Sequence, residues 1–358
     1  MYSLRVQRKD TNNPLKHIFF TRFPSENRNN SSKTIRNSKT FSPILASAGA
    51  ALYFGSMKES YHICFTSHDE VMFRDEEDHG MFVNLMALRG FAEDSDIIVD
   101  AEMSTHVHLN VFTNRPQHFA ANLRMPYTRF LNRKYGRKGR LGQKYTFVLK
   151  VQGDVHQMVL ESYILRNGLH HSAAATAFGY KYCSVRDLFV EDICLLREQP
   201  VAWSRSEIAS FLPRHAEFPD EYRMNEKGVF VRQSFMELRL AERYYGSPRN
   251  YLYQMNRLSG EDWIQEQQKD QTGKAITLYD IEPADEKTVA DMLKNENGRN
   301  FSRSRLQDMD VCRLIDKDIL QGAKTVYQLT DSEKSRIGRQ LLYEFHLPEH
   351  QIRRCLVL

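Results

Sequence analysis

The segment "DIIVDAEMSTHVHLNVFT", residues 96–113, reads as two β-strands joined by a short turn. In its second half, Val107, Leu109 and Val111 alternate with polar residues. Because side chains alternate between the two faces of a strand, this apolar set predicts the core side. His106 and His108 are therefore expected to project together from the opposite face.

The segments on either side alternate between strand and helix periodicity. Residues 60–67 form an apolar, β-prone run, and residues 75–93 form a helical pattern with acids in its first turn. Residues 115–136, 143–152 and 154–169 then predict a helix, a strand and a second helix. The order βαββαβα predicts an α+β fold, a ferredoxin-like four-stranded antiparallel sheet with helices on one face and the other face open to a ligand.

Composition divides the 358-residue chain into three parts. Residues 1–56 are rich in Asn, Ser, Lys and Arg with almost no acid, which predicts a flexible basic N-terminal extension. The composition changes at Met57 to an apolar, β-prone stretch. Met57 is therefore a candidate translation start, which the intact mass of the native protein would test. Residues 57–190 contain the predicted sheet, and residues 191–358 predict a mainly helical C-terminal region.

Several classes of protein are excluded by composition. No apolar run approaches the roughly 20 residues that span a bilayer, so no membrane segment is predicted. The five cysteines lack CxxC spacing, which argues against a zinc ribbon or a dense disulfide framework and favours a reduced, cytoplasmic location. The net charge of +5 is modest, and its distribution is more informative.

Two pairs of residues have the spacing of a site. His106 and His108 can bring two ring nitrogens to one divalent ion, although a polar, solvated strand face gives the same pattern. Tyr163 and Asn167 are four residues apart on a predicted helix, so a phenolic oxygen and an amide oxygen lie on the same face. The alternative is a tyrosine that packs its ring at the edge of the core.

The order of four segments resembles the single-tyrosine HUH transposases. The segments are "YHI" at 61–63, "STHVHLNV" at 104–111, "YTRFLNRKYGRKGRLGQ" at 127–143 and "YILRN" at 163–167. The branch they resemble comprises the REP-associated tyrosine transposases and related insertion-sequence transposases that act on single-stranded DNA. The resemblance covers about residues 57–190 and implies that this part is the catalytic domain.

The resemblance also implies roles for individual residues. His106 and His108 would bind a divalent metal, Tyr163 would be the nucleophile, and Asn167 would complete the metal site. Mg²⁺ or Mn²⁺ suits such an open shell of neutral ligands. Many relatives follow the asparagine with proline, whereas this chain has Gly168 and, shortly after it, two histidines at 170 and 171.

The implied activity is that of a metal-dependent, site-specific single-stranded DNA endonuclease and strand transferase. It would act through a covalent 5′-phosphotyrosine intermediate, on strands with hairpin or repeat sequences, as a monomer or a homodimer in the cytoplasm with the nucleoid. One alternative is a catalytically silent nucleic-acid-binding regulator with the same fold. Another is a metal-dependent hydrolase in which water replaces tyrosine.

The distribution of charge supports a nucleic-acid substrate. Residues 116–153 contain no Asp or Glu, and aromatic residues are interleaved with the basic ones. Basic side chains neutralise phosphates and aromatic rings stack on unpaired bases, although a solvated helix face with a charged loop has a similar composition. The residues predicted to contact DNA here are Arg124, Arg129, Arg133, Lys134, Arg137, Lys138, Arg140 and Lys144.

The last segment, residues 330–358, predicts two helices. Thr330 and Glu333 have the spacing of a capping box, and "HLPE" supplies a short turn before the second helix. A helix-turn-helix would place Arg353 and Arg354 on the second helix, within reach of duplex DNA. An ordinary helical hairpin fits the pattern equally well.

Overall fold

The computed structural model describes residues 57–67, 69–193, 199–257, 278–281, 290 and 306–358. The chain divides into two compact units, Met1–Tyr53 and Phe54–Leu358. The extension predicted at residues 1–56 lies outside the described residues.

A four-stranded antiparallel sheet forms the centre of this unit. Its strands are β1 (Glu59–Thr66), β2 (Asp96–Glu102), β3 (His106–Thr113) and β4 (Phe147–Lys150), in the spatial order β2-β3-β1-β4. In register, His108 lies between Cys64 of β1 and Ala101 of β2. The predicted ferredoxin-like sheet, followed by a mainly helical C-terminal region, is confirmed.

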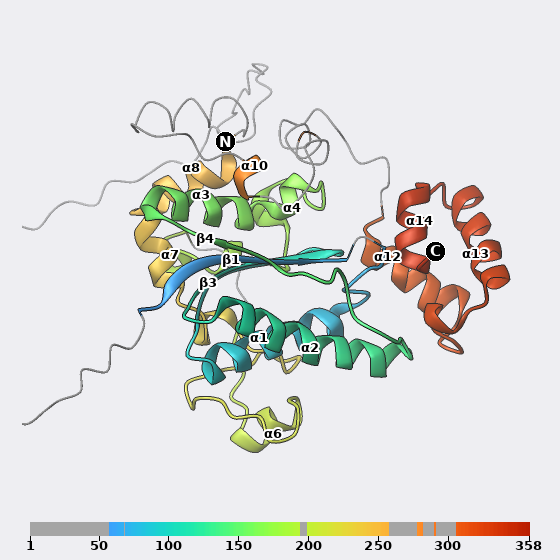
Figure 1. Ribbon diagram of the computed structural model, residues 1–358, viewed down its shortest axis with the longest axis horizontal. Helices are drawn as coiled ribbons and strands as arrows, with labels where there is room; N and C mark the ends of the chain where they lie inside the picture. Colours follow the sequence, from blue (N-terminus) through green and yellow to red (C-terminus); the bar gives the residue numbers. More distant parts are fainter. Residues whose placement is uncertain (1–56, 68, 194–198, 258–277, 282–289, 291–305) are drawn as a thin grey trace, which may run out of the picture. The chain divides into compact units, whose positions relative to one another are not determined.

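Helices cover both faces of the sheet (Figure 1). On one face lie α1 (Glu76–Ala92), which begins at a capping box, and α2 (Pro116–Tyr135), which ends at Gly136 with φ 64°. On the other face lie α3 (Gly153–Leu165) and α4 (Asn167–His170). The face expected to be open to a ligand is therefore covered, because α3 is apolar enough to pack against the sheet and against two further helices, α7 and α8.

The apolar set of β3 lies in the core, as the alternation predicts. Val107, Leu109 and Val111 are fully buried. They belong to the same hydrophobic cluster as Phe82 of α1 and Leu123 of α2. Their burial leaves the histidines of β3 on the face that α3 covers.

Parts of the segment that follows α4 pack on the sheet and on α3, whereas Ile208 packs with Ala87 and Leu88 of α1. Its elements are 3₁₀ turns η1 (Ala177–Gly179), η2 (Ser184–Arg186) and η3 (Arg232–Ser234), and helices α5 (Val190–Ile193), α6 (Arg205–Ser210), α7 (Leu238–Tyr245), α8 (Pro248–Asn256) and α10 (Leu278–Ile281). Arg232 forms buried ion pairs with Asp100 and Glu102 of β2. Ser162 of α3 and Tyr245 of α7 lie 3.1 Å apart between their hydroxyl oxygens.

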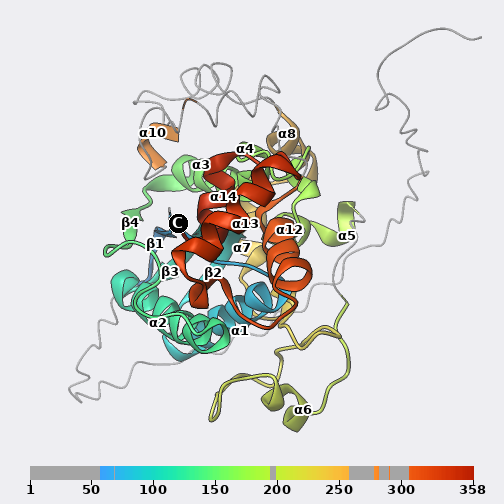
Figure 2. The same cartoon turned by 90° about the vertical axis from the view of Figure 1, so that its right-hand side faces the viewer.

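The C-terminal region forms a helical group with its own core (Figure 2). It contains α12 (Asp308–Arg313), a π-helical turn η4 (Leu314–Ile319), the 3₁₀ turn η5 (Val326–Gln328), α13 (Asp331–Tyr343) and α14 (Glu349–Leu356). The predicted capping box between Thr330 and Glu333 starts α13. Val71, from the loop before α1, inserts into this core. None of the helices in the described part of the chain is long and apolar enough to cross a membrane.

Candidate active site

Strand β3 and helices α3 and α4 bring the four predicted site residues together. The hydroxyl oxygen of Tyr163 lies 3.4 Å from Nε2 of His108. Oδ1 of Asn167 lies 3.1 Å from Nε2 of His106. All four side chains are buried, with at most 8% of any residue exposed. Residues 61 positions apart in sequence thus form one compact polar cluster.

The junction between α3 and α4 sets the orientation of Asn167. Helix α3 ends at Leu165, Arg166 adopts φ −94° and ψ 5°, and α4 begins at Asn167. The Arg166 guanidinium fixes this junction, because it donates to the backbone carbonyls of Gln254 at 3.0 Å and Arg257 at 2.7 Å. Tyr163 and Asn167 consequently face the same side although the helix is not continuous between them.

Packing against Tyr180 explains Gly168, which follows the asparagine where many relatives have proline. A Cβ atom at this position would lie 2.4 Å from Cβ of Tyr180. The Tyr180 side chain is held in place because its hydroxyl donates to the backbone carbonyl of Glu102 at 2.7 Å. Any larger residue at 168, proline included, would collide with this ring.

Three further histidines surround the cluster, and the sequence patterns did not assign them to the site. Nε2 of His62 lies 2.9 Å from Nδ1 of His108. The rings of His170 and Tyr163 have their centroids 5.2 Å apart, and those of His171 and His106 4.6 Å apart. The strand pairing in the predicted fold offered a signal for His62, since β1 runs next to β3.

Burial lowers the pKa of three of these imidazoles, those of His62, His108 and His171. Burial and the nearby His156 lower the pKa of His62 to about 3, against a smaller opposite effect from the backbone of Ile281. Burial and the neighbouring imidazoles, foremost that of His106, lower the pKa of His108 and of His171 well below the usual value. A neutral imidazole retains a lone pair, which is the form that binds a metal ion.

Two of the proposed donor atoms, Nε2 of His106 and Oδ1 of Asn167, have a spacing compatible with two ligands of a small divalent cation. Two ligands bound at right angles, with bonds of about 2.1 Å, lie about 3 Å apart. The 3.1 Å between Nε2 of His106 and Oδ1 of Asn167 agrees with this spacing. Among the described residues no group of three or more His, Cys, Asp and Glu side chains could hold a metal ion. A site here would therefore consist of two imidazoles and an amide oxygen.

A buried polar network continues along α3 beside the cluster. Ser60 donates to Oε1 of Gln157 at 2.6 Å, and Nδ2 of Asn110 donates to Ser60 at 2.8 Å. Nε2 of Gln157 in turn donates to the carboxyl group of Glu161 at 2.9 Å. Burial raises the pKa of Glu161 to about 8, partly opposed by the hydrogen bond from Gln157. The acid is thus neutral at pH 7, and its Oε2 makes no hydrogen bond within the described residues.

Glu161 should make the stability of the protein fall progressively as the pH rises from about 4.5 to about 8. Its pKa in the folded protein, about 8, exceeds the ordinary 4.5, so folding favours the protonated form. This stabilisation is complete below pH 4.5 and is lost as the pH rises through about 8. Between about pH 7 and pH 9 the wild-type protein is expected to lose about 1 kcal/mol of unfolding free energy that Glu161→Gln keeps. Denaturant unfolding of both proteins at the two pH values measures the difference, and equal losses would contradict it.

The predicted DNA-contact residues fall into two groups. Lys134 is paired with Asp75, Glu77 and Asp78, Arg137 is buried against Glu70, and Arg354 is paired with Asp308. Arg124 donates to the carbonyl groups of Gln143 and Lys144. The side chains that stay exposed are those of Arg129, Arg133, Lys138, Arg140, Lys144 and Arg353.

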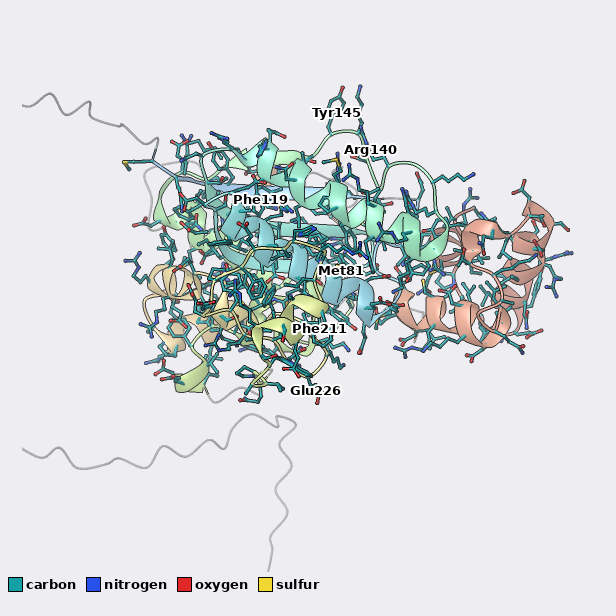
Figure 3. The ribbon with its side chains drawn as sticks, turned by 90° about the horizontal axis from the view of Figure 1, so that it is seen from below. Met81, Phe119, Arg140, Tyr145, Phe211 and Glu226 are labelled. Carbon is teal, nitrogen blue, oxygen red and sulfur yellow. The ribbon has the colours of Figure 1, made fainter. Side chains whose placement is uncertain are left out.

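A cavity of about 530 Å³ lies beside the exposed basic residues. Lys138 and Arg140 line it from the loop after α2, and Tyr327 lines it from η5. The loop is attached to the end of β1 next to the histidines, because the Gln143 amide donates to the carbonyl of Thr66, which pairs with His106. Figure 3 shows Arg140 and Tyr145 on this loop, with Tyr145 pointing away from the sheet. Basic and aromatic side chains therefore occur together near the candidate site.

Comparisons with known proteins give limited information. No protein-family model matches the chain, and no curated protein matches it. Among solved structures, it is similar to a REP-associated tyrosine transposase bound to a REP hairpin, with 11% sequence identity and a TM-score of 0.33. The match covers 49% of this chain and 98% of the other chain. A similarity of this size does not establish a shared function, so the assignment depends on the geometry of the site.

Proposed function

We propose that this protein cleaves and rejoins single-stranded DNA by metal-dependent transesterification, in the manner of an HUH tyrosine transposase. The observation that carries the proposal is the convergence of Tyr163, His106, His108 and Asn167 in one buried cluster. A tyrosine that merely packed at the core edge would not need its hydroxyl beside a histidine of this cluster. The resemblance of the sequence to this family points to the same residues.

The chemistry follows from these groups. The Tyr163 oxygen attacks phosphorus, the bond from phosphorus to the 3′ oxygen breaks, and the released strand leaves with a 3′-hydroxyl group. The 5′ phosphate of the other fragment remains on tyrosine, and the reverse attack by a 3′-hydroxyl rejoins strands. Because one phosphodiester bond replaces another, no nucleotide cofactor is consumed. A Mg²⁺ or Mn²⁺ ion held by His106, His108 and Asn167 would stabilise charge on the phosphoryl oxygens.

Access to Tyr163 requires a local movement. The residue is only 2% exposed, and Asn167 and His108 are fully buried. A phosphodiester therefore reaches the hydroxyl only when the elements that cover it move. In the closed arrangement the nucleophile is protected from reaction with other groups.

We place the DNA path along the exposed basic residues of the loop after α2. These residues, the exposed Tyr145 and the cavity lined by Tyr327 provide phosphate contacts and surfaces on which unpaired bases stack. The path leads from the loop to the end of β1, next to His106. Strands with a hairpin or repeat beside the cleavage site are the proposed substrates.

One experiment separates this function from its alternatives. The full chain is incubated with Mg²⁺ or Mn²⁺ and labelled single strands that carry the repeats flanking its own gene. The proposal requires cleavage together with a protein–DNA adduct that survives denaturation. A silent regulator would bind the strand without cleaving it, and a hydrolase would cleave it without forming an adduct. Either result would refute the proposal.

Four exposed basic residues should contribute directly to the salt dependence of DNA binding. Replacing Arg133, Lys138, Arg140 and Lys144 by alanine is expected to weaken binding and to reduce the slope of log affinity against log salt by up to about 3, since each lost phosphate contact on a single strand removes about 0.7. Fluorescence anisotropy over a salt series measures this slope.

A matched variant controls for net charge. It replaces four exposed basic residues from the segment around α6, which lies away from α3 (Figure 1): Arg205, Arg214, Arg223 and Lys227. This variant loses the same charge but should keep most of the wild-type slope. Equal slopes for both variants would move the DNA path away from the loop after α2.

A further inference from the structure

His62 is in direct contact with a proposed metal ligand and has no role in the function described above. It lies on β1, is fully buried, and approaches Nδ1 of His108 to 2.9 Å through its own Nε2. The two ring planes differ by 22°. Phe147 and Tyr163 pack edge-on against the His62 ring, with centroids 5.6 Å and 6.2 Å away. Packing and hydrogen bonding therefore fix the orientation of this imidazole.

The contact between the two rings permits only one of two proton arrangements. A hydrogen bond between two ring nitrogens contains one proton, so one ring donates and the other accepts. Either His108 donates from Nδ1 to His62, or His62 donates from Nε2 to His108. The first arrangement leaves a lone pair on Nε2 of His108, which faces the Tyr163 hydroxyl. The second places a proton on that atom and prevents it from binding a cation.

The proposed metal site requires the first arrangement. An imidazole that gives its Nε2 lone pair to a cation carries its proton on Nδ1. Nδ1 of His108 then donates to Nε2 of His62, 2.9 Å away. In the absence of a cation, the Tyr163 hydroxyl can donate to the free Nε2 of His108 at 3.4 Å.

We propose that His62 is a positioning residue that holds His108 in the Nδ1–H tautomer and so presents Nε2 of His108 to the metal ion. The inference rests on the proposed function for its purpose, but the tautomer itself is a property of the metal-free protein. Partners that orient a ligating histidine in this way typically affect metal affinity by about 10- to 100-fold. His62 does not touch the substrate in this scheme and acts only through His108.

Nitrogen NMR of the metal-free full chain tests the tautomer directly. With ¹⁵N-labelled histidine, the long-range ¹H–¹⁵N pattern distinguishes a protonated Nδ1 from a protonated Nε2, and His108→Gln identifies the signals of His108. The expected pattern is Nδ1–H for His108 in the wild-type protein. An Nε2–H pattern would overturn the proposal, whether or not the protein cleaves DNA.

Two variants at position 62 separate positioning from folding. His62→Phe keeps a buried ring but removes the acceptor, so the Nδ1–H population of His108 should fall and Mn²⁺ affinity should drop about 10- to 100-fold. His62→Gln places an amide oxygen near the position of Nε2 and should keep the tautomer and most of the affinity. Titration calorimetry with Mn²⁺ alone, alongside melting temperatures, provides the readout. Wild-type tautomer and affinity in His62→Phe, or equal losses in both variants at similar stability, would refute the positioning role.

Discussion

Tyr163→Phe is expected to eliminate the covalent adduct and to reduce strand cleavage by at least ~10³-fold, the scale of losing a catalytic nucleophile. Phenylalanine keeps the ring that packs against His62, His108 and His170 and removes only the oxygen. Since that oxygen makes a long contact of 3.4 Å, stability should change by less than about 1 kcal/mol. DNA binding should be retained. Denaturing gels with a labelled strand measure adduct and cleavage together.

Tyr127→Phe is a matched control for this experiment. Tyr127 is also fully buried, and its hydroxyl donates to the carbonyl of Met72 at 2.8 Å on the opposite side of the sheet. Its loss should lower stability slightly without affecting the adduct. In the wild-type protein, mass spectrometry should find the nucleotide on the tryptic peptide of residues 151–166, in which Tyr163 is the only tyrosine. An adduct on another peptide, or full cleavage by Tyr163→Phe, would refute the assignment.

The sheet could be predicted because its information is local. The alternation in β3 and the acidic first turn of α1 each specify an element within a few positions. The ferredoxin-like order then follows from the sequence of strands and helices. The covering of the second face was not predicted, because it depends on α7 and α8, whose packing against α3 joins residues far apart in the chain.

Part of the candidate site could also be predicted. The HxH spacing and the four-residue spacing of Tyr163 and Asn167 are local patterns, and the structure places both pairs in one cluster. Whether a basic side chain is exposed or paired with an acid depends on residues far away in the sequence. In the sequence, Arg137 and Lys134 look like phosphate ligands. In the structure, Arg137 pairs with Glu70 and Lys134 pairs with Asp78, and each pair joins residues more than 50 positions apart. His62 was overlooked for the same reason, since only strand pairing brings it to His108.

His106→Ala and His108→Ala are each expected to reduce cleavage by about 10²-fold or more at ordinary Mg²⁺ or Mn²⁺ concentrations. The reason is that each removes one of the two imidazole donors and leaves Tyr163 in place. Mn²⁺ binding measured by calorimetry without DNA should weaken in parallel. Chelation of divalent ions should abolish cleavage by the wild-type protein and leave its DNA binding largely intact.

The pattern of partial losses distinguishes a metal site from a merely polar core. Asn167→Ala removes one weaker donor, so slow cleavage should recover partly at high metal concentration, whereas Tyr163→Phe should not recover at any concentration. His118→Ala is the control, because His118 is an exposed imidazole on α2 paired with Glu93 and should keep wild-type rates. If His106→Ala or His108→Ala cleaves at the wild-type rate while folding normally, the paired-ligand assignment is wrong, and the cluster would hold Tyr163 by hydrogen bonding alone.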